Sequence, residues 1–191
     1  MRIASVLLAS AFGFASTALS AADYAIANAH SQVYFTVNHL GFSNSTGLLR
    51  VKEGTVSLNE KDWSKSRVEV ILDVATLQMG DNTWNEHLAA DKFFNTAKFP
   101  TARFVSTKVL KTGENTGTMV GNLTFLGTTK PVTLNIKTNK VGKNPMSNKD
   151  YAGFSATGSL KRSDFGLVAY PGAIGEEVSL RIEVEGEAVA K

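Results

Sequence analysis

Three histidines, His30, His39 and His87, are the residues of this chain best suited to bind a transition metal. They lie far apart in the sequence, and none has a second histidine or a cysteine at the spacing of a metal motif. Structural and catalytic zinc sites need three or four converging ligands. We therefore expect no metal site, and interpret His39, which precedes Leu40-Gly41, as a hydrogen-bonding residue at a strand end.

Motifs for nucleophilic or acid–base catalysis are also missing from the sequence. The chain has no cysteine, and it has no Gly-x-Ser-x-Gly, the motif that holds a serine nucleophile on a strand-to-helix turn. Aspartate and glutamate fall mostly on polar faces, where water solvates them, and nothing singles out two of them as an acid–base pair. Gly121 and Gly127 precede Lys130, but no helix follows, so no phosphate loop is predicted. We expect no catalytic residue and no cofactor.

The elements that would position a site are short β-strands. Residues 119–126 and 132–137 alternate apolar and polar side chains around a Gly127–Pro131 break, which predicts an antiparallel hairpin with Pro131 opening the second strand. Similar alternation occurs in residues 33–38, 51–58, 67–74, 99–108, 154–160 and 177–185, with a loop expected at 43–47. About eight strands at near-regular spacing predict an all-β barrel or sandwich.

One segment has the period of a helix instead of a strand. Trp84, His87 and Leu88 would share one face of a helix over residues 82–90. Asp81 or Asn82 precedes the segment and is suited to cap its N-terminus. We predict a single short helix in the long connection before the strand that begins near Phe99.

The first 21 residues have the features of a secretory signal peptide. Met1-Arg2 is followed by an uncharged, small and apolar run, and Leu19-Ser20-Ala21-Ala22 supplies small residues for cleavage. The run is too short and too rich in alanine and serine to span a membrane comfortably, since a span needs about 20 strongly apolar residues. We expect residues 1–21 to be removed, residues 22–191 to form one domain, and the product to be periplasmic without a stable membrane anchor.

The charges exclude two further classes of protein. The 20 basic and 17 acidic side chains give a net charge of +3, and the basic residues are scattered, so binding to nucleic acid or to an anionic membrane has no support. Arg67, Glu69 and Asp73 lie on one face of an alternating segment. A membrane-spanning barrel needs an apolar outward face, so we expect the charged face in water and the apolar face inside.

The apolar faces leave two interpretations open. The chain has 11 phenylalanines, and inward-facing ones could form a closed core or line a tunnel. Eight strands enclose enough space for side chains or for one small ligand. Because protein interiors normally pack densely, physical reasoning alone favours the closed core.

The order of several short motifs is similar to that of the YceI-like family, exported proteins that bind lipids or polyisoprenoids. The matching segments are Tyr24-Ala25-Ile26 with His30-Ser31; His39-Leu40-Gly41 with Gly47; His87-Leu88, Asp91, Phe93-Phe94-Asn95 and Phe99-Pro100-Thr101; Gly121-Asn122-Leu123-Thr124, Gly127 and Thr129-Lys130-Pro131-Val132-Thr133-Leu134; and Gly153-Phe154, Arg162-Ser163-Asp164-Phe165-Gly166, Val178 and Leu180. The chain departs from the pattern at Trp84-Asn85, where relatives usually carry Arg-Asp, at Thr128, and at Ala27-Asn28-Ala29, which lacks a frequent acidic residue.

This resemblance implies a lipocalin-like, eight-stranded antiparallel β-barrel that holds a long isoprenoid or fatty-acyl chain in its lumen and acts as a carrier. The entrance would lie near the predicted helix. The residues expected to contact the ligand are Phe35, Val37, Phe42, Trp84, His87, Leu88, Phe104, Phe125, Phe154 and Leu160. Two alternatives stay open: an enzyme acting on a lipid, and a packed barrel that works through its surface. A homodimer also stays open.

Overall fold

The structure, a computed structural model, describes residues 21–190. The predicted signal peptide lies outside these residues except for Ala21, so it stays a prediction. The strands are β1 (Ala22–Ile26), β2 (Gln32–His39), β3 (Ser43–Leu58), β4 (Arg67–Gln78), β5 (Thr101–Lys111), β6 (Thr116–Phe125), β7 (Thr128–Lys143), β8 (Asp150–Lys161) and β9 (Ile174–Ala188). The helices are α1 (Asn82–Ala89) and the short 3₁₀ turns η1 (Asn28–His30), η2 (Trp63–Lys65) and η3 (Arg162–Phe165).

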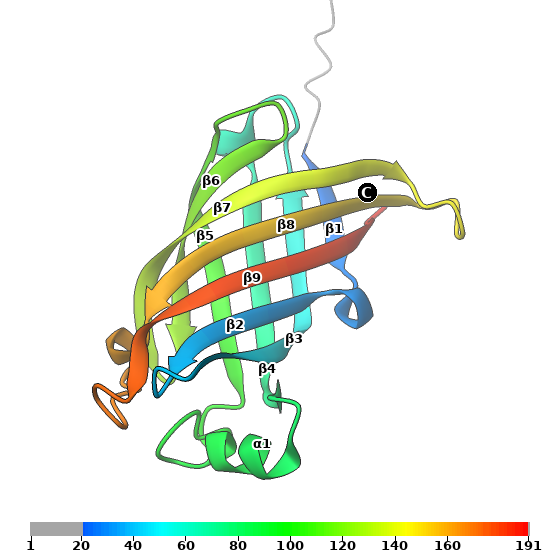
Figure 1. Ribbon diagram of the computed structural model, residues 1–191. Helices are drawn as coiled ribbons and strands as arrows, with labels where there is room; N and C mark the ends of the chain where they lie inside the picture. Colours follow the sequence, from blue (N-terminus) through cyan, green and yellow to red (C-terminus); the bar gives the residue numbers. More distant parts are fainter. Residues whose placement is uncertain (1–20, 191) are drawn as a thin grey trace, which may run out of the picture.

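All nine strands belong to one antiparallel sheet that closes on itself (Figure 1). The sheet runs in the order β1-β3-β2-β9-β8-β7-β6-β5-β4, and a β3–β4 pairing closes the ring. β1 and β2 occupy one place in the ring, because both lie between β3 and β9. β1 pairs with residues 55–58 of β3 and 186–188 of β9, and β2 pairs with residues 43–50 of β3 and 174–183 of β9. The ring therefore has eight positions, and the prediction of an eight-stranded antiparallel barrel is confirmed.

Ser31 provides hydrogen bonds to β9 at the point where the η1 turn, between β1 and β2, interrupts the strand pairing. Its side chain is fully buried. The hydroxyl accepts a hydrogen bond from the Glu185 backbone N–H at 3.1 Å and lies 3.3 Å from the Glu185 carbonyl oxygen, to which it can donate. A buried backbone group without a partner is costly. The serine thus replaces the ladder bonds that the η1 turn removes, and the wall stays continuous.

The β6–β7 hairpin is tighter than the sequence indicated. Phe125 pairs with Thr128, and Leu126 and Gly127 both have positive φ angles, of 50° and 76°, as a type I′ turn requires. Pro131 therefore lies inside β7, opposite Asn122, and the prediction that it opens the strand is wrong. β8 pairs with β7 only from Leu134 onward, so Pro131 lies beside a free edge where the missing N–H is tolerated.

The predicted loop at residues 43–47 is also wrong, because these residues form the first part of β3. They pair with β2 from His39↔Ser43 to Phe35↔Gly47. The polar residues suggested a loop, but in a barrel strand only every second side chain faces the lumen, and the others face water. The real turn is shorter, with Leu40 and Gly41 at φ angles of 57° and 76°.

Helix α1 begins and ends close to the predicted limits. The Asp81 carboxylate accepts a hydrogen bond from the Trp84 backbone N–H at 2.9 Å, which confirms the predicted N-cap. The Asn85 amide oxygen accepts another from the Met79 N–H at 2.6 Å. These two bonds fix the chain on either side of Gly80, whose φ of 85° suits glycine. The helix lies below one end of the barrel (Figure 1).

Candidate functional site: the barrel lumen

The barrel encloses a cavity of about 510 Å³. Side chains from all nine strands and from the α1 segment line it, and nearly all of them are apolar. Leu40, His87 and Tyr170 line it and are also exposed to solvent, so the cavity opens at the end of the barrel that carries α1; we call this opening the mouth. Trp63 of η2, which is only 6% exposed, lines the cavity far from the mouth.

Nine of the ten residues expected to contact a ligand line this cavity: Phe35, Val37, Trp84, His87, Leu88, Phe104, Phe125, Phe154 and Leu160. Phe42 does not. It is 91% exposed because the tight turn at Leu40-Gly41 directs it away from the wall, so its placement in the lumen is a correction to the sequence-based assignment. Contact of the other nine with a ligand stays a prediction.

The lumen is open, although dense packing alone favoured a closed core. Two large rings lie directly against glycines of the wall. A Cβ atom added to Gly47 would come within 2.2 Å of the Phe35 ring, and one added to Gly121 would come within 2.2 Å of the Phe104 ring. These close approaches need glycine. The rings consequently occupy the space of missing side chains and leave the centre of the barrel free.

A row of aromatic rings crosses the lumen just inside the mouth. Phe94, from the segment after α1, lies with its ring centroid 5.8 Å from that of Phe35 and 5.6 Å from that of Phe125. Phe125 continues to Phe165 at 5.9 Å. The rings are tilted, as favourable aromatic pairs are. The row joins β2, β6 and η3 to the α1 segment and gives the cavity an aromatic inner rim.

A second set of rings holds the α1 segment at the mouth. His39 of β2 lies 5.6 Å from Trp84, and Phe93 lies 5.0 Å from His87 and 6.1 Å from Tyr170. None of the residues of α1 is buried. The helix is thus attached by aromatic contacts at its edges, while few of its side chains enter the core.

Arg162 organises the connection between β8 and β9, which forms one side of the mouth. The residue is 6% exposed, and its guanidinium donates hydrogen bonds to the carbonyl oxygens of Gly175 at 3.0 Å, Ala169 at 2.9 Å, Ile174 at 3.2 Å and Leu167. A planar fork of N–H donors suits such a set of acceptors. Because its guanidinium is bound to four backbone carbonyl oxygens, Arg162 acts as a structural anchor for this connection.

Glu176 supplies the nearest negative charge to this arginine. Its carboxylate lies 4.0 Å from Arg162 Nε and accepts hydrogen bonds from the hydroxyl and backbone N–H of Ser163. The Ser163 hydroxyl, aided by its backbone N–H and by Arg162, lowers the pKa of Glu176 below the usual value. The carboxylate therefore stays ionised beside the buried cation.

Sequence reasoning missed Phe94 and Arg162 as site residues. Phe93-Phe94 lacks strand alternation and follows the helix, so nothing in its spacing placed it inside the barrel. Nothing in the spacing around Arg162 indicated that this charged residue would be buried. The only available signal was that both belong to motifs of the resemblance, in Phe93-Phe94-Asn95 and Arg162–Gly166.

The lining determines what chemistry the site can perform. No carboxylate is among its residues in the described part of the chain, and its cations are Arg162, which is fully engaged, and Lys137. Within residues 21–190 no three His, Asp or Glu side chains come together in a way that could hold a metal ion. No helix in this range is long and apolar enough to cross a membrane. The cavity therefore offers an apolar surface for binding.

Comparison with known proteins assigns the fold and the family. The model of the YceI-like domain matches residues 24–186. Protein YceI of Salmonella arizonae is 39% identical over 168 residues, covering 87% of this chain and 87% of that protein. BcnA of Burkholderia cenocepacia superposes with a TM-score of 0.72 at 21% identity, over 84% of this chain and 98% of BcnA.

A polyisoprenoid-binding domain from Saccharophagus degradans has the same fold, with a TM-score of 0.61 at 17% identity, over 88% of this chain and 99% of that domain. Likeness at such low identity speaks for the fold alone. The family match covers most of the described residues, and several residues of the sequence motifs, among them His39, His87, Phe93 and Phe94, line the cavity. This chain belongs to the YceI-like family.

Proposed function

We propose that this protein is a periplasmic carrier that holds one long isoprenoid or fatty-acyl chain in the barrel lumen. The observation that carries the proposal is the open cavity of about 510 Å³ with an almost wholly apolar lining. Clefts of this size and character are typical ligand sites. The polyisoprenoid-binding domain of the same fold supports the choice of ligand class.

The size of the cavity suits a chain better than a compact head group. If a methylene takes about the share of one liquid water, ~30 Å³, the cavity holds on the order of 15 such groups. Each buried methylene contributes about 0.8 kcal/mol. Ten of them contribute roughly 8 kcal/mol, which exceeds the lower estimate of about 4 kcal/mol for the cost of association. Apolar burial alone can therefore hold a tail.

The polar end of the ligand would stay at the mouth. His87 and Tyr170 are exposed there, whereas the deeper wall is formed by residues such as Val109, Met119 and Leu134. A polar group without a partner is costly in an apolar interior. The gradient from a wet mouth to a dry interior thus orients an amphipathic lipid with its tail inward.

Exchanging Phe125 for aspartate tests the lumen as the site. We expect Phe125→Asp to lose most of the lipid that co-purifies with the wild type, because a carboxylate in an apolar channel is costly unless it is protonated or hydrated. Native mass spectrometry before and after organic extraction measures the bound lipid. Asn122→Asp places the same charge on the exposed face of the same strand and should retain the wild-type lipid.

Equal lipid in folded Phe125→Asp and Asn122→Asp would show that the lumen near Phe125 is not the site. Cooperative unfolding of both variants establishes that they are folded. A wild type that neither carries lipid nor takes up an added prenol would refute the carrier. Turnover of an added lipid ester would favour the enzyme alternative.

Export is tested separately by N-terminal sequencing. We expect protein recovered from the periplasm to begin near Ala22, because small residues for cleavage precede that position. An intact Met1 on protein in a washed membrane fraction would contradict both the cleavage and the periplasmic carrier.

A further inference from the structure

Two turns beside the mouth expose apolar side chains and carry no charge. We call them the mouth tips: the β2–β3 turn, residues 40–42, and the β8–β9 connection, residues 166–173. Stretches 38–49 and 165–175, which contain them, include no Asp, Glu, Lys or Arg, in a chain of which 19% of residues are charged. Such a local absence of charge allows the tips to leave water without an ionic desolvation cost.

The exposed side chains are large. Phe42 is 91% exposed, Val168 63%, Leu40 51% and Tyr170 46%. Among the described residues these four account for most of the exposed large hydrophobic side chains; the others are Leu110, Met146 and Val189. Clustered exposed hydrophobics indicate an interaction site more than scattered ones do.

The two tips are joined to each other and to the lumen. The Leu40 backbone N–H donates to the Ala173 carbonyl oxygen at 2.8 Å, and His39 pairs with Ile174. Leu40 and Tyr170 also line the cavity. In Figure 1 both tips lie at the end of the barrel that carries α1, at the lower left. The exposed apolar surface is therefore continuous with the lumen wall.

We propose that the mouth tips insert into the surface of a phospholipid bilayer, so that the lumen opens toward the acyl chains and a lipid tail can pass without crossing water. The inference rests on the proposed function. Binding at a membrane surface scales with the apolar area that is buried, and here exposed apolar side chains on two uncharged turns flank the opening of an apolar lumen. Tyr170 carries the Lys92 ammonium 4.1 Å above its ring, and such amphipathic groups favour the boundary between water and lipid.

Apolar insertion and not charge would drive this docking. Residues 81–98, which include α1 and the segment after it, contain Lys92 and Lys98 but also Asp81, Glu86 and Asp91, so this stretch has no excess of positive charge. The tips themselves have none. Binding to neutral vesicles should consequently be as strong as binding to anionic ones, and it should change little with salt.

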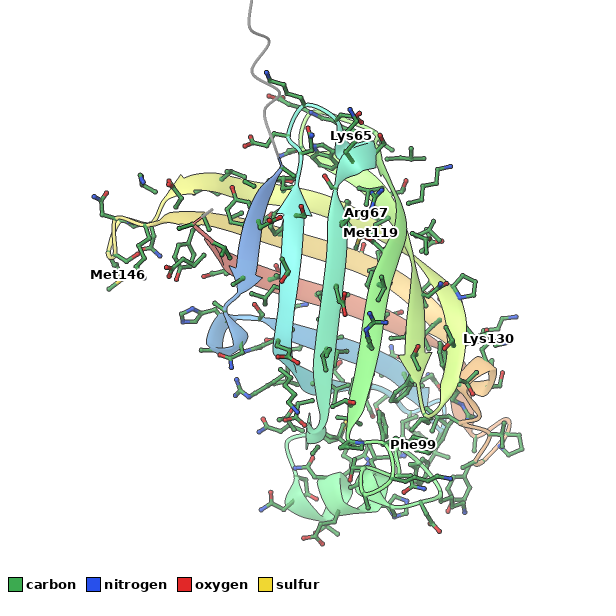
Figure 2. All side chains as sticks on the ribbon, turned by 180° about the vertical axis from the view of Figure 1, so that it is seen from behind. Lys65, Arg67, Phe99, Met119, Lys130 and Met146 are labelled. Carbon is green, nitrogen blue, oxygen red and sulfur yellow. The ribbon has the colours of Figure 1, made fainter. Side chains whose placement is uncertain are left out.

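The test is sedimentation of the mature protein with vesicles of phosphatidylcholine alone. We expect the wild type to bind and Phe42→Asp to bind at least about tenfold more weakly, because binding scales with buried apolar area. Met146→Asp is the matched control. Met146 is 96% exposed but lies at the far tip of the β7–β8 hairpin, away from α1 (Figure 2), so this variant should bind like the wild type.

Equal binding of Phe42→Asp and the wild type, or failure of the wild type to bind, would overturn the proposal. So would a wild-type dimer that Phe42→Asp converts to a monomer without any effect on vesicle binding. Uptake of a detergent-dispersed prenol, measured by native mass spectrometry, distinguishes failure of membrane docking by the mouth tips from failure of lipid binding in the lumen. Phe42→Asp should retain uptake, while Phe125→Asp should lose uptake and keep vesicle binding. Loss of uptake in Phe42→Asp would also count against a separate docking surface.

Discussion

Replacing Arg162 with methionine is expected to destabilise the protein by at least about 1–3 kcal/mol, the cost of leaving a buried polar group without its hydrogen-bond partner. Methionine fills much of the volume but donates no hydrogen bond. It would leave four carbonyl oxygens of the β8–β9 connection without their donor, and Glu176 without its nearest cation. Urea unfolding measures the change, and hydrogen exchange should show faster exchange in residues 166–175.

Arg103→Met is the control for this experiment. Arg103 pairs with Glu69 at 2.7 Å, but both side chains are about half exposed. Exposed pairs contribute less than about 1 kcal/mol. A loss in Arg162→Met no larger than that in Arg103→Met would contradict the anchoring role. Arg162→Lys should recover only part of the stability, because an ammonium cannot match a planar fork of donors.

Gly121→Ala is expected to reduce both stability and the capacity of the lumen. The new methyl group would meet the Phe104 ring at 2.2 Å and the Val105 carbonyl oxygen at 2.7 Å, so the ring must swing into the cavity and the backbone must shift. Overpacking of this kind costs about 1–3 kcal/mol. Native mass spectrometry should show less bound lipid, and thermal unfolding a lower midpoint.

Gly153→Ala is a matched control in β8, because its Cβ would meet only the Cβ of Asn139, at 4.0 Å. A second exchange provides the coupling test. Phe104→Leu replaces the ring that the new methyl group would meet with a smaller side chain. Gly121→Ala should therefore reduce the stability less in the Phe104→Leu background than in the wild type. Unchanged lipid content and stability in Gly121→Ala would mean that the glycine does not keep the lumen open.

Alternation in the sequence predicted the strands and their inward faces well, because a strand places every second side chain on the same side. Phe35 and Val37 were assigned inward from the alternation of residues 33–38, and both line the cavity. The N-cap at Asp81 followed from equally local chemistry. These features depend on a few neighbouring residues, so the sequence contains what is needed to predict them.

Features that depend on distant residues were not predictable in the same way. That β1 and β2 share one position is decided by pairing with β9, some 150 residues away. Whether Phe35 fills the lumen or lies on the wall is decided by Gly47 on the adjacent strand. The exposure of Phe42 follows from a turn that polar composition had placed a few residues later. Patterns within one segment contain none of this information.

The shared position of β1 and β2 has a consequence for the order in which the chain folds. In chain order, the last pairing that completes the ring is that of β9 with β1 and β2, and next to it the Val189 backbone N–H donates a hydrogen bond to the Asp23 carbonyl oxygen at 2.8 Å. Bringing such remote segments together costs loop-closure entropy before any contact repays it, and barrels dominated by such contacts fold in roughly milliseconds to seconds. Until β9 docks, β2 and β8 each expose an unpaired edge. The lumen is thus completed only when β9 has docked, so the proposed lipid would enter a barrel that is already folded.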